Sequence, residues 1–223
     1  APEIPLQHPP QPRFLVYELT LAAFAILLVA LLIVPETSQR VGFDSHRHMW
    51  RTLVPQASVP SALQRLFLTA IPAFVATWSM GGLYLSLGSS VVARVFGIAN
   101  HGAAGAVLFV FFASGAVTSL TITAWGADTK LTFGYPALAG GAIISLAGVL
   151  TSLLPLYIIG SIIAGSGFAG TFLGALDSIS DQTPPHQRGQ VFSAVFITSY
   201  IAFSVPAVIC LLYTSDAADE EDS

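Results

Sequence analysis

The sequence predicts an all-α protein, a polytopic bundle of about six helices that span a lipid bilayer. Of its 223 residues 54% are hydrophobic and only 9% are charged, whereas an average soluble domain has about 25% charged residues. In addition, no Asp, Glu, Lys or Arg occurs within residues 66–93, 95–127 or 131–176. Because a helix of roughly 20 apolar residues crosses the ~30 Å hydrocarbon core of a bilayer, each of these stretches is long enough for at least one crossing.

The boundaries of the expected helices follow from where the apolar runs begin and end. Residues 131–176 are too long for one crossing, since a single helix would extend for about 69 Å at 1.5 Å per residue. Pro155 disfavours helix at the residue before it, so we expect a break there. The six expected helices cover about residues 14–34, 66–89, 101–125, 132–151, 154–177 and 191–209.

The distribution of basic residues predicts which ends of these helices face the cytoplasm. If successive loops alternate between the two sides, one side receives six of the eight Lys and Arg residues. The other side receives only Arg13 and Arg94. Loops rich in Lys and Arg remain in the cytoplasm, so we expect residues 35–65, 126–130 and 178–190 to lie there.

Small residues predict where helices approach one another closely. The expected fifth helix contains two pairs of small residues four apart, Gly160 with Ala164 and Gly170 with Gly174. The expected fourth helix contains Gly134, Gly140, Gly141 and Gly148. Because such spacing lets helix backbones meet in lipid, we expect both helices in the interior of the bundle.

Four short motifs, in this order and spacing, resemble the major facilitator superfamily of bacterial transporters. They are PETSQR at residues 35–40, WSMGGLYLSLG at 78–88, GSGFAG at 165–170 and PPHQRG at 184–189. Tyr200 and Pro206 fit the same alignment. It equates residues 14–209 with helices six to eleven of that family, so the resemblance implies a fragment that lacks the first five helices and the last.

The resemblance also implies a domain organisation. Residues 1–34 would end the amino-terminal half, whose last helix is about 14–34, and residues 35–65 would form the central cytoplasmic loop. Residues 66–209 would form five helices of the carboxy-terminal half. The loop around residues 126–130 departs from the family pattern, because only GADTK remains of a longer basic motif.

A transporter of this family would work by alternating access in the cytoplasmic (inner) membrane, as a multi-pass protein. The resemblance implies coupling to protons, and the aromatic, Gly, Ser and Thr residues suit efflux of uncharged or lipophilic small molecules. The alternative is a polytopic membrane scaffold or assembly subunit. A transporter should contain a polar, water-accessible cavity near Trp78 and Tyr200, and a scaffold should have a dry, packed interior.

Candidate site residues fall into three groups. A substrate cavity would be lined by Trp78, Gly81, Gly82, Tyr84, Ser199 and Tyr200, although aromatic side chains at these spacings also suit helix packing. A cytoplasmic gate would comprise Asp128, Lys130, Asp177 and Arg188, with Asp177 paired to Lys130 or Arg188; a solvated helix end explains Asp177 equally well. Glu18 is a candidate proton carrier, but we favour a position at the level of the lipid headgroups.

Several other classes of function find no support in the sequence. There is no phosphate-binding loop, zinc-hydrolase motif or nucleophile elbow, so we expect neither an enzyme nor a cofactor. His46 and His48 have no further ligand nearby, so we expect no metal site, and no basic run suggests nucleic acid.

The last residues carry a second, separate resemblance. Residues 210–220, CLLYTSDAADE, resemble a translated sequencing adapter, so we expect residues 210–223 to be artefactual. The alternative is a genuine acidic cytoplasmic tail.

Overall fold

The computed structural model describes residues 12–34, 59–98 and 100–221. These residues fall into two units, Ala1–Leu53 and Val54–Ser223. The first unit contains α1 (Pro12–Ile33). Its described side chains from Tyr17 onward are all exposed, and α1 coincides with the first expected helix.

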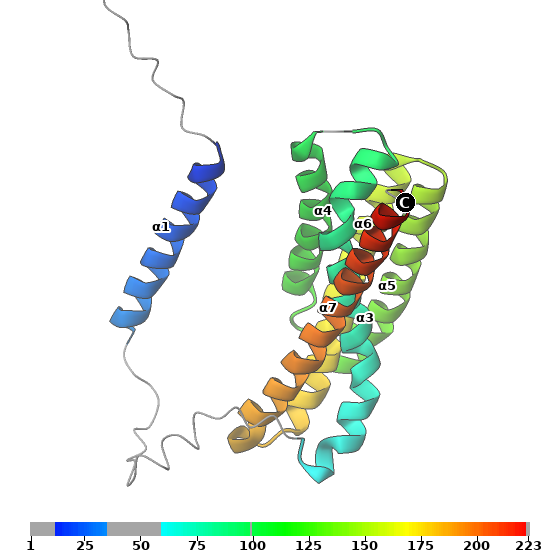
Figure 1. The fold of residues 1–223 in the computed structure, drawn as a ribbon. Helices are drawn as coiled ribbons and strands as arrows, with labels where there is room; N and C mark the ends of the chain where they lie inside the picture. Colours follow the sequence, from blue (N-terminus) through cyan, green and yellow to red (C-terminus); the bar gives the residue numbers. More distant parts are fainter. Residues whose placement is uncertain (1–11, 35–58, 99, 222–223) are drawn as a thin grey trace, which may run out of the picture. The chain divides into compact units, whose positions relative to one another are not determined.

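The second unit is a bundle of five long helices joined by short loops (Figure 1). They are α3 (Gln64–Arg94), α4 (His101–Thr121), α5 (Ala127–Leu150), α6 (Leu154–Gln182) and α7 (Arg188–Glu221). Single 3-10 turns, η1 (Ser61–Leu63) and η2 (Pro185–Gln187), lead into α3 and α7. All five are long and apolar enough to cross a membrane, which confirms the predicted all-α bundle of membrane-spanning helices.

The helix boundaries differ from the expected ones where packing overrides local sequence. The helix α3 continues through two serines to Arg94 because Val92 is fully buried in the core. The helix α5 begins early, at Ala127, and α6 continues five residues beyond Asp177. The break between α5 and α6 lies at the expected place, and Pro155 occupies the first turn of α6, where its missing N–H costs nothing.

The bundle is held together around α3 and α6 by two apolar clusters. One joins α3, α6 and α7 near the start of α3 and includes Phe74, Ile179 and Val195. The other joins α3, α4 and α6 near the opposite end and includes Tyr84 and Phe111. As a result, α7 packs on one half of α3 and α4 packs on the other half.

Three of the four glycines of α5, namely Gly134, Gly141 and Gly148, lie against α6, whereas nothing lies close to Gly140. A Cβ atom on Gly141 would collide with the backbone of Ala164, and one on Gly167 would collide with the backbone of Leu138. However, 50% of the most apolar stretch of α6 is buried, compared with 28% of the corresponding stretch of α5. The expectation that both helices are interior is therefore wrong for α5, which packs almost entirely on α6 and presents its other faces outward.

The described part of the tail is helical. Residues 210–221 continue the helix α7 without interruption. Most of the expected central loop, residues 35–58, lies outside the described residues, as do His46 and His48.

Candidate functional site

Trp78 lies in the middle of α3, where four aromatic rings of α6 and α7 surround it. Its ring centroid is 5.8 Å from those of Phe172 and Tyr200, 6.1 Å from that of Phe203 and 6.4 Å from that of Phe168. Three of these contacts are edge-to-face, the geometry that aromatic quadrupoles prefer. Although the indole nitrogen Nε1 is buried, it has no hydrogen-bond partner.

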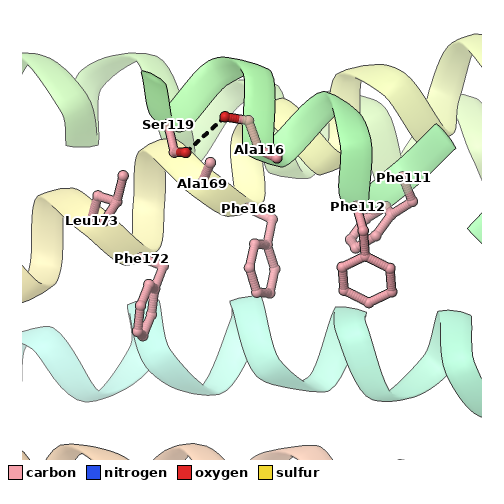
Figure 2. Close-up of a pocket in the computed structure, with 9 residues that line it drawn as sticks. Phe111, Phe112, Ala116, Ser119, Phe168, Ala169, Phe172 and Leu173 are labelled. Carbon is pink, nitrogen blue, oxygen red and sulfur yellow. Dashed lines mark hydrogen bonds between the residues drawn. The ribbon is translucent and has the colours of Figure 1, made fainter. Parts of the chain in front are cut away.

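A cavity of about 210 Å³ lies between α4 and α6, beside this cluster. Its lining residues are Phe111, Phe112, Gly115, Ala116, Ser119, Phe168, Ala169, Phe172 and Leu173. Figure 2 shows the rings of Phe112, Phe168 and Phe172 extending from α4 and α6 toward α3. None of the lining residues is ionisable, and the Ser119 hydroxyl already donates to the carbonyl of Ala116 at 2.7 Å.

Glycines fix the shape of this cavity. A Cβ atom on Gly115 would come within 3.0 Å of the carbonyl oxygen of Gly165, and a Cβ atom on Gly165 would collide with the carbonyl oxygen of Phe111. The backbones of α4 and α6 therefore touch at these glycines. The phenylalanine rings fill only part of the space beside that contact, which leaves an apolar hollow where the expected cavity was to be polar.

Tyr84, which the sequence predicted in a substrate cavity, is not among the residues that line this one. It is only 5% exposed, and its ring stacks on that of Phe111 with centroids 4.2 Å apart. Its hydroxyl lies 2.9 Å from the hydroxyls of both Ser145 and Ser161. Because Ser161 donates its proton to the carbonyl of Tyr157, Tyr84 must donate to Ser161 and accept from Ser145. This chain of hydrogen bonds ties α3 to α5 and α6 inside the bundle.

The two glycines after Trp78 serve packing, each in a different direction. A Cβ atom on Gly82 would come within 2.5 Å of the carbonyl oxygen of Phe203, so Gly82 permits the close approach of α3 and α7. Gly81 is also buried and faces the ring of Phe168, with 3.6 Å to a Cβ atom. Only Gly81 therefore adjoins a cavity-lining side chain.

Ser199 and Tyr200 occupy opposite environments on α7. Ser199 is fully buried, whereas Tyr200 is 59% exposed and reaches the aromatic cluster around Trp78. Tyr200 also borders a groove of about 420 Å³ whose lining residues all belong to α7. Of the expected cavity residues, Trp78 contacts both Phe168 and Phe172, Gly81 faces Phe168, and Tyr200 contacts Trp78. The other three, Gly82, Tyr84 and Ser199, are buried in helix packing.

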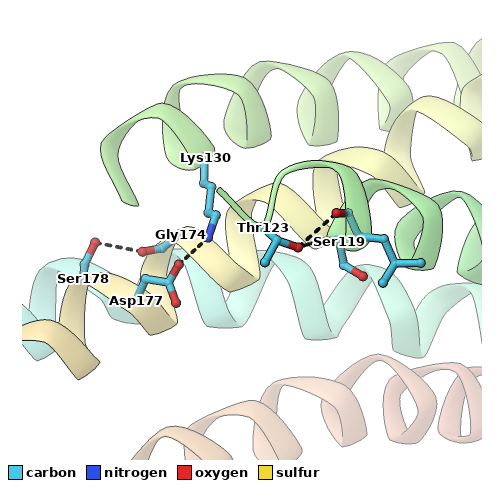
Figure 3. A network of polar contacts seen from close by, with 7 residues as sticks. Ser119, Thr123, Lys130, Gly174, Asp177 and Ser178 are labelled. Atoms are coloured by element: carbon cyan, nitrogen blue, oxygen red, sulfur yellow. Dashed lines mark hydrogen bonds and ion pairs between the residues drawn. The ribbon is translucent and has the colours of Figure 1, made fainter. Parts of the chain in front are cut away.

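An ion pair joins α5 to α6 at the end of the bundle where α3 and α7 begin (Figure 3). The ammonium Nζ of Lys130 donates to Oδ2 of Asp177 at 2.6 Å. The Lys130 side chain is 7% exposed and that of Asp177 38% exposed, so the lysine is the buried partner. Close packing of α5 on α6 brings the pair together, since Gly174 lies against Leu131 and Ala127.

The other expected gate residues do not join this pair. Arg188 donates from Nε to the carbonyl oxygen of Thr183 at 3.4 Å, across the turn between α6 and α7. Asp128 is exposed in the first turn of α5, where the helix dipole stabilises a carboxylate. Glu18 lies exposed on α1, in the other unit. No group of three metal-ligating side chains occurs among residues 12–34, 59–98 and 100–221.

Sequence reasoning missed the phenylalanines that form the cavity wall. Phe112, Phe168 and Phe172 are three of 15 phenylalanines in the chain, and nothing in an apolar run distinguishes a ring beside a cavity from one in a core. The glycines Gly115 and Gly165 were a usable sequence signal, because glycines on two neighbouring helices let their backbones meet, as these two do.

Comparison with known proteins gives one match. A family model described as "Major Facilitator Superfamily" matches residues 15–206. No curated protein and no solved structure matches the chain. The family match extends from α1 to residue 206 of α7, and the five spans that are long and apolar enough to cross a membrane fall within it. This multi-pass membrane protein therefore belongs to the major facilitator superfamily of transporters.

Proposed function

We propose that the chain is part of a secondary active transporter that exports neutral, lipophilic small molecules across the cytoplasmic membrane. The observation that carries this proposal is the uncharged cavity between α4 and α6, walled by Phe112, Phe168 and Phe172. Aromatic and apolar walls bind flat, apolar molecules through contact area, with few polar groups to fix orientation. A charged molecule would lose its hydration there without gaining a counter-ion, which is costly.

Transport by alternating access requires a cavity that opens to one side of the membrane at a time. We propose that α3 to α7 form one wall of the cargo path and that a second group of helices, an amino-terminal half by family resemblance, forms the other. The cavity between α4 and α6 supports this arrangement. Cargo would shift the equilibrium between the two states only through its differential affinity for them.

The pair Lys130–Asp177 suits a cytoplasmic gate. Its position beside the first turn of α5 matches the end of the bundle that carries Arg65, Lys130 and Arg188, whereas Arg94 lies at the opposite end. This end is the one that the excess of positive charge assigns to the cytoplasm. A partly buried ion pair at a helix junction is strong when dry and weak when water enters, which is the behaviour that a gate requires.

Coupling to protons is proposed from the family resemblance alone. None of the residues that line the cavity between α4 and α6 is ionisable, so the proton-carrying groups would lie elsewhere. Glu18 remains the one acidic candidate on α1. A test with a protonophore addresses this coupling separately from export itself.

Export should depend on open space between α4 and α6. Ala116 is exposed and lines the cavity, so Ala116→Trp should fill the hollow without disturbing the core. We expect the complete gene product with this change to release preloaded Nile red, a neutral lipophilic dye, at least tenfold more slowly than the unaltered protein. Efflux is followed by fluorescence in cells, with and without a protonophore.

Val117→Trp is the matched control, because Val117 is the next residue, is 61% exposed and does not line the cavity. It should leave efflux unchanged. Equal efflux from both variants would remove the cavity from the cargo path. If the unaltered protein exports none of a panel of neutral dyes, the scaffold alternative is favoured instead. The hollow would then be only a packing defect.

A further inference from the structure

The indole N–H of Trp78 is an unpaired donor in the middle of a membrane helix. Buried N–H groups are almost always paired, and each exception needs an explanation. Two other buried polar atoms, Oγ1 of Thr171 and Oγ of Ser199, also lack partners. Both belong to helical side chains that reach the carbonyl oxygen four residues earlier by a change of χ1. An indole has no such local acceptor, so Trp78 stands apart.

No acceptor bonds to the indole nitrogen, although the hydroxyl-bearing ring of Tyr200 is one of the four around Trp78. The other three rings, Phe168, Phe172 and Phe203, offer no lone pair. An N–H directed at a ring face is a weak substitute for a hydrogen bond to oxygen. The indole N–H would therefore gain a hydrogen bond if an acceptor oxygen came within reach.

Two rings link Trp78 to the cavity. Phe168 and Phe172 both contact Trp78 and both line the hollow between α4 and α6. Their rings are nearly parallel, with an interplanar angle of 21° and centroids 6.3 Å apart. For cargo in the cavity to reach the indole, one of these rings would have to rotate about χ1, and side chains in helices have alternative rotamers for such a change.

From this geometry we propose that Trp78 is a specificity-determining residue, whose indole N–H donates a hydrogen bond to a neutral acceptor on the cargo. The inference rests on the proposed function and narrows its cargo class to flat apolar molecules that carry a carbonyl, ether or similar oxygen. Ser119, the one hydroxyl-bearing residue that lines the cavity, already donates to a backbone carbonyl. Trp78 is thus the unused donor next to the cavity within the described part of the chain.

A matched pair of probes isolates this hydrogen bond. Fluorenone and fluorene share one flat skeleton and differ in that fluorenone carries a carbonyl oxygen. Leaving a buried donor unpaired costs more than an average hydrogen bond contributes. We therefore expect the purified complete gene product to bind fluorenone about tenfold more tightly than fluorene, measured by equilibrium binding of the tritiated compounds.

Trp78→Phe removes the N–H and keeps an aromatic ring. The preference for fluorenone should therefore disappear, so that both probes bind about equally, while the affinity for fluorene changes little. Replacement of Trp78 by benzothienylalanine, which has sulfur in place of the N–H and nearly the same shape, should have the same effect. This second variant keeps the test valid if Trp78→Phe disturbs packing. Trp125→Phe is the control, because Trp125 is 42% exposed and packs on Phe133 away from the cavity. It should retain the tenfold preference.

The outcomes separate this inference from the proposed function. A preference that survives in both Trp78 variants, or an unaltered protein that binds both probes equally, would overturn the role of the indole. The proposed export function would still be tested separately by Nile red efflux from the variants at Ala116 and Val117. If the unaltered protein binds neither probe, the assignment of acceptor-bearing aromatic cargo is wrong.

Discussion

Gly141→Ala should destabilise the bundle, whereas Gly140→Ala, one residue away on the same helix, should not. A Cβ atom on Gly141 would collide with the backbone of Ala164, and this backbone cannot move without separating α5 from α6 along their length. Nothing lies within 4 Å of a Cβ atom on Gly140. Overpacking costs about 1–3 kcal/mol even against movable side chains, so we expect a loss of at least about 2 kcal/mol for Gly141→Ala.

The control has the opposite expected sign. Alanine is a better helix former than glycine by roughly 1 kcal/mol, so Gly140→Ala should raise the free energy of unfolding slightly. Both values are measured by titration of the purified protein from mild detergent into SDS. Equal effects of the two changes would show that α5 and α6 do not meet at Gly141.

Asp177→Asn should cost more stability than Lys130→Met, although both changes break the same ion pair. The Lys130 side chain is 7% exposed, so loss of the carboxylate leaves an ammonium without a counter-ion and largely without water. Asp177 is 38% exposed, so its carboxylate remains hydrated when the lysine is removed. Breaking a fully buried pair costs about 3–5 kcal/mol; with this partial exposure we expect about 2 kcal/mol for Asp177→Asn and less than about 1 kcal/mol for Lys130→Met.

The double variant tests the physical reason for this difference. Once Lys130 is methionine, no buried charge remains to be left unpaired, so adding Asp177→Asn should cost almost nothing. The free energies of unfolding of the two single variants and the double variant complete the cycle. Additive losses would mean that Lys130 and Asp177 do not interact in the folded protein.

The sequence was sufficient to predict the helices because charge and hydropathy are local properties. A helix must satisfy its own backbone groups in lipid, and uncharged runs of the right length mark such helices directly. Pro155 placed the break between α5 and α6 for a similarly local reason. The end of α3 was less predictable, because burial of Val92 against other helices carries the helix past its two serines.

The site was less predictable because it depends on contacts between distant residues. Lys130 and Asp177 are 47 positions apart, and the sequence left Arg188 as an equal partner for Asp177. The sequence predicts Tyr84 as a cavity residue, and in the structure its hydroxyl lies between those of Ser145 and Ser161. Its helix position is the same in either case. Only the packing of α3 on α5 and α6 determines which environment the ring enters.

The measurement that tests the account most directly is the accessibility of the two ends of α5. In a protein whose single cysteine is removed by Cys210→Ser, Gly126→Cys and Thr151→Cys place one thiol before and one after this 24-residue helix. A membrane-impermeant maleimide added to intact cells should label Thr151→Cys at once and Gly126→Cys only after permeabilisation. Labelling of both thiols from the same side would contradict a helix that spans the membrane, and with it the transporter proposed for this chain.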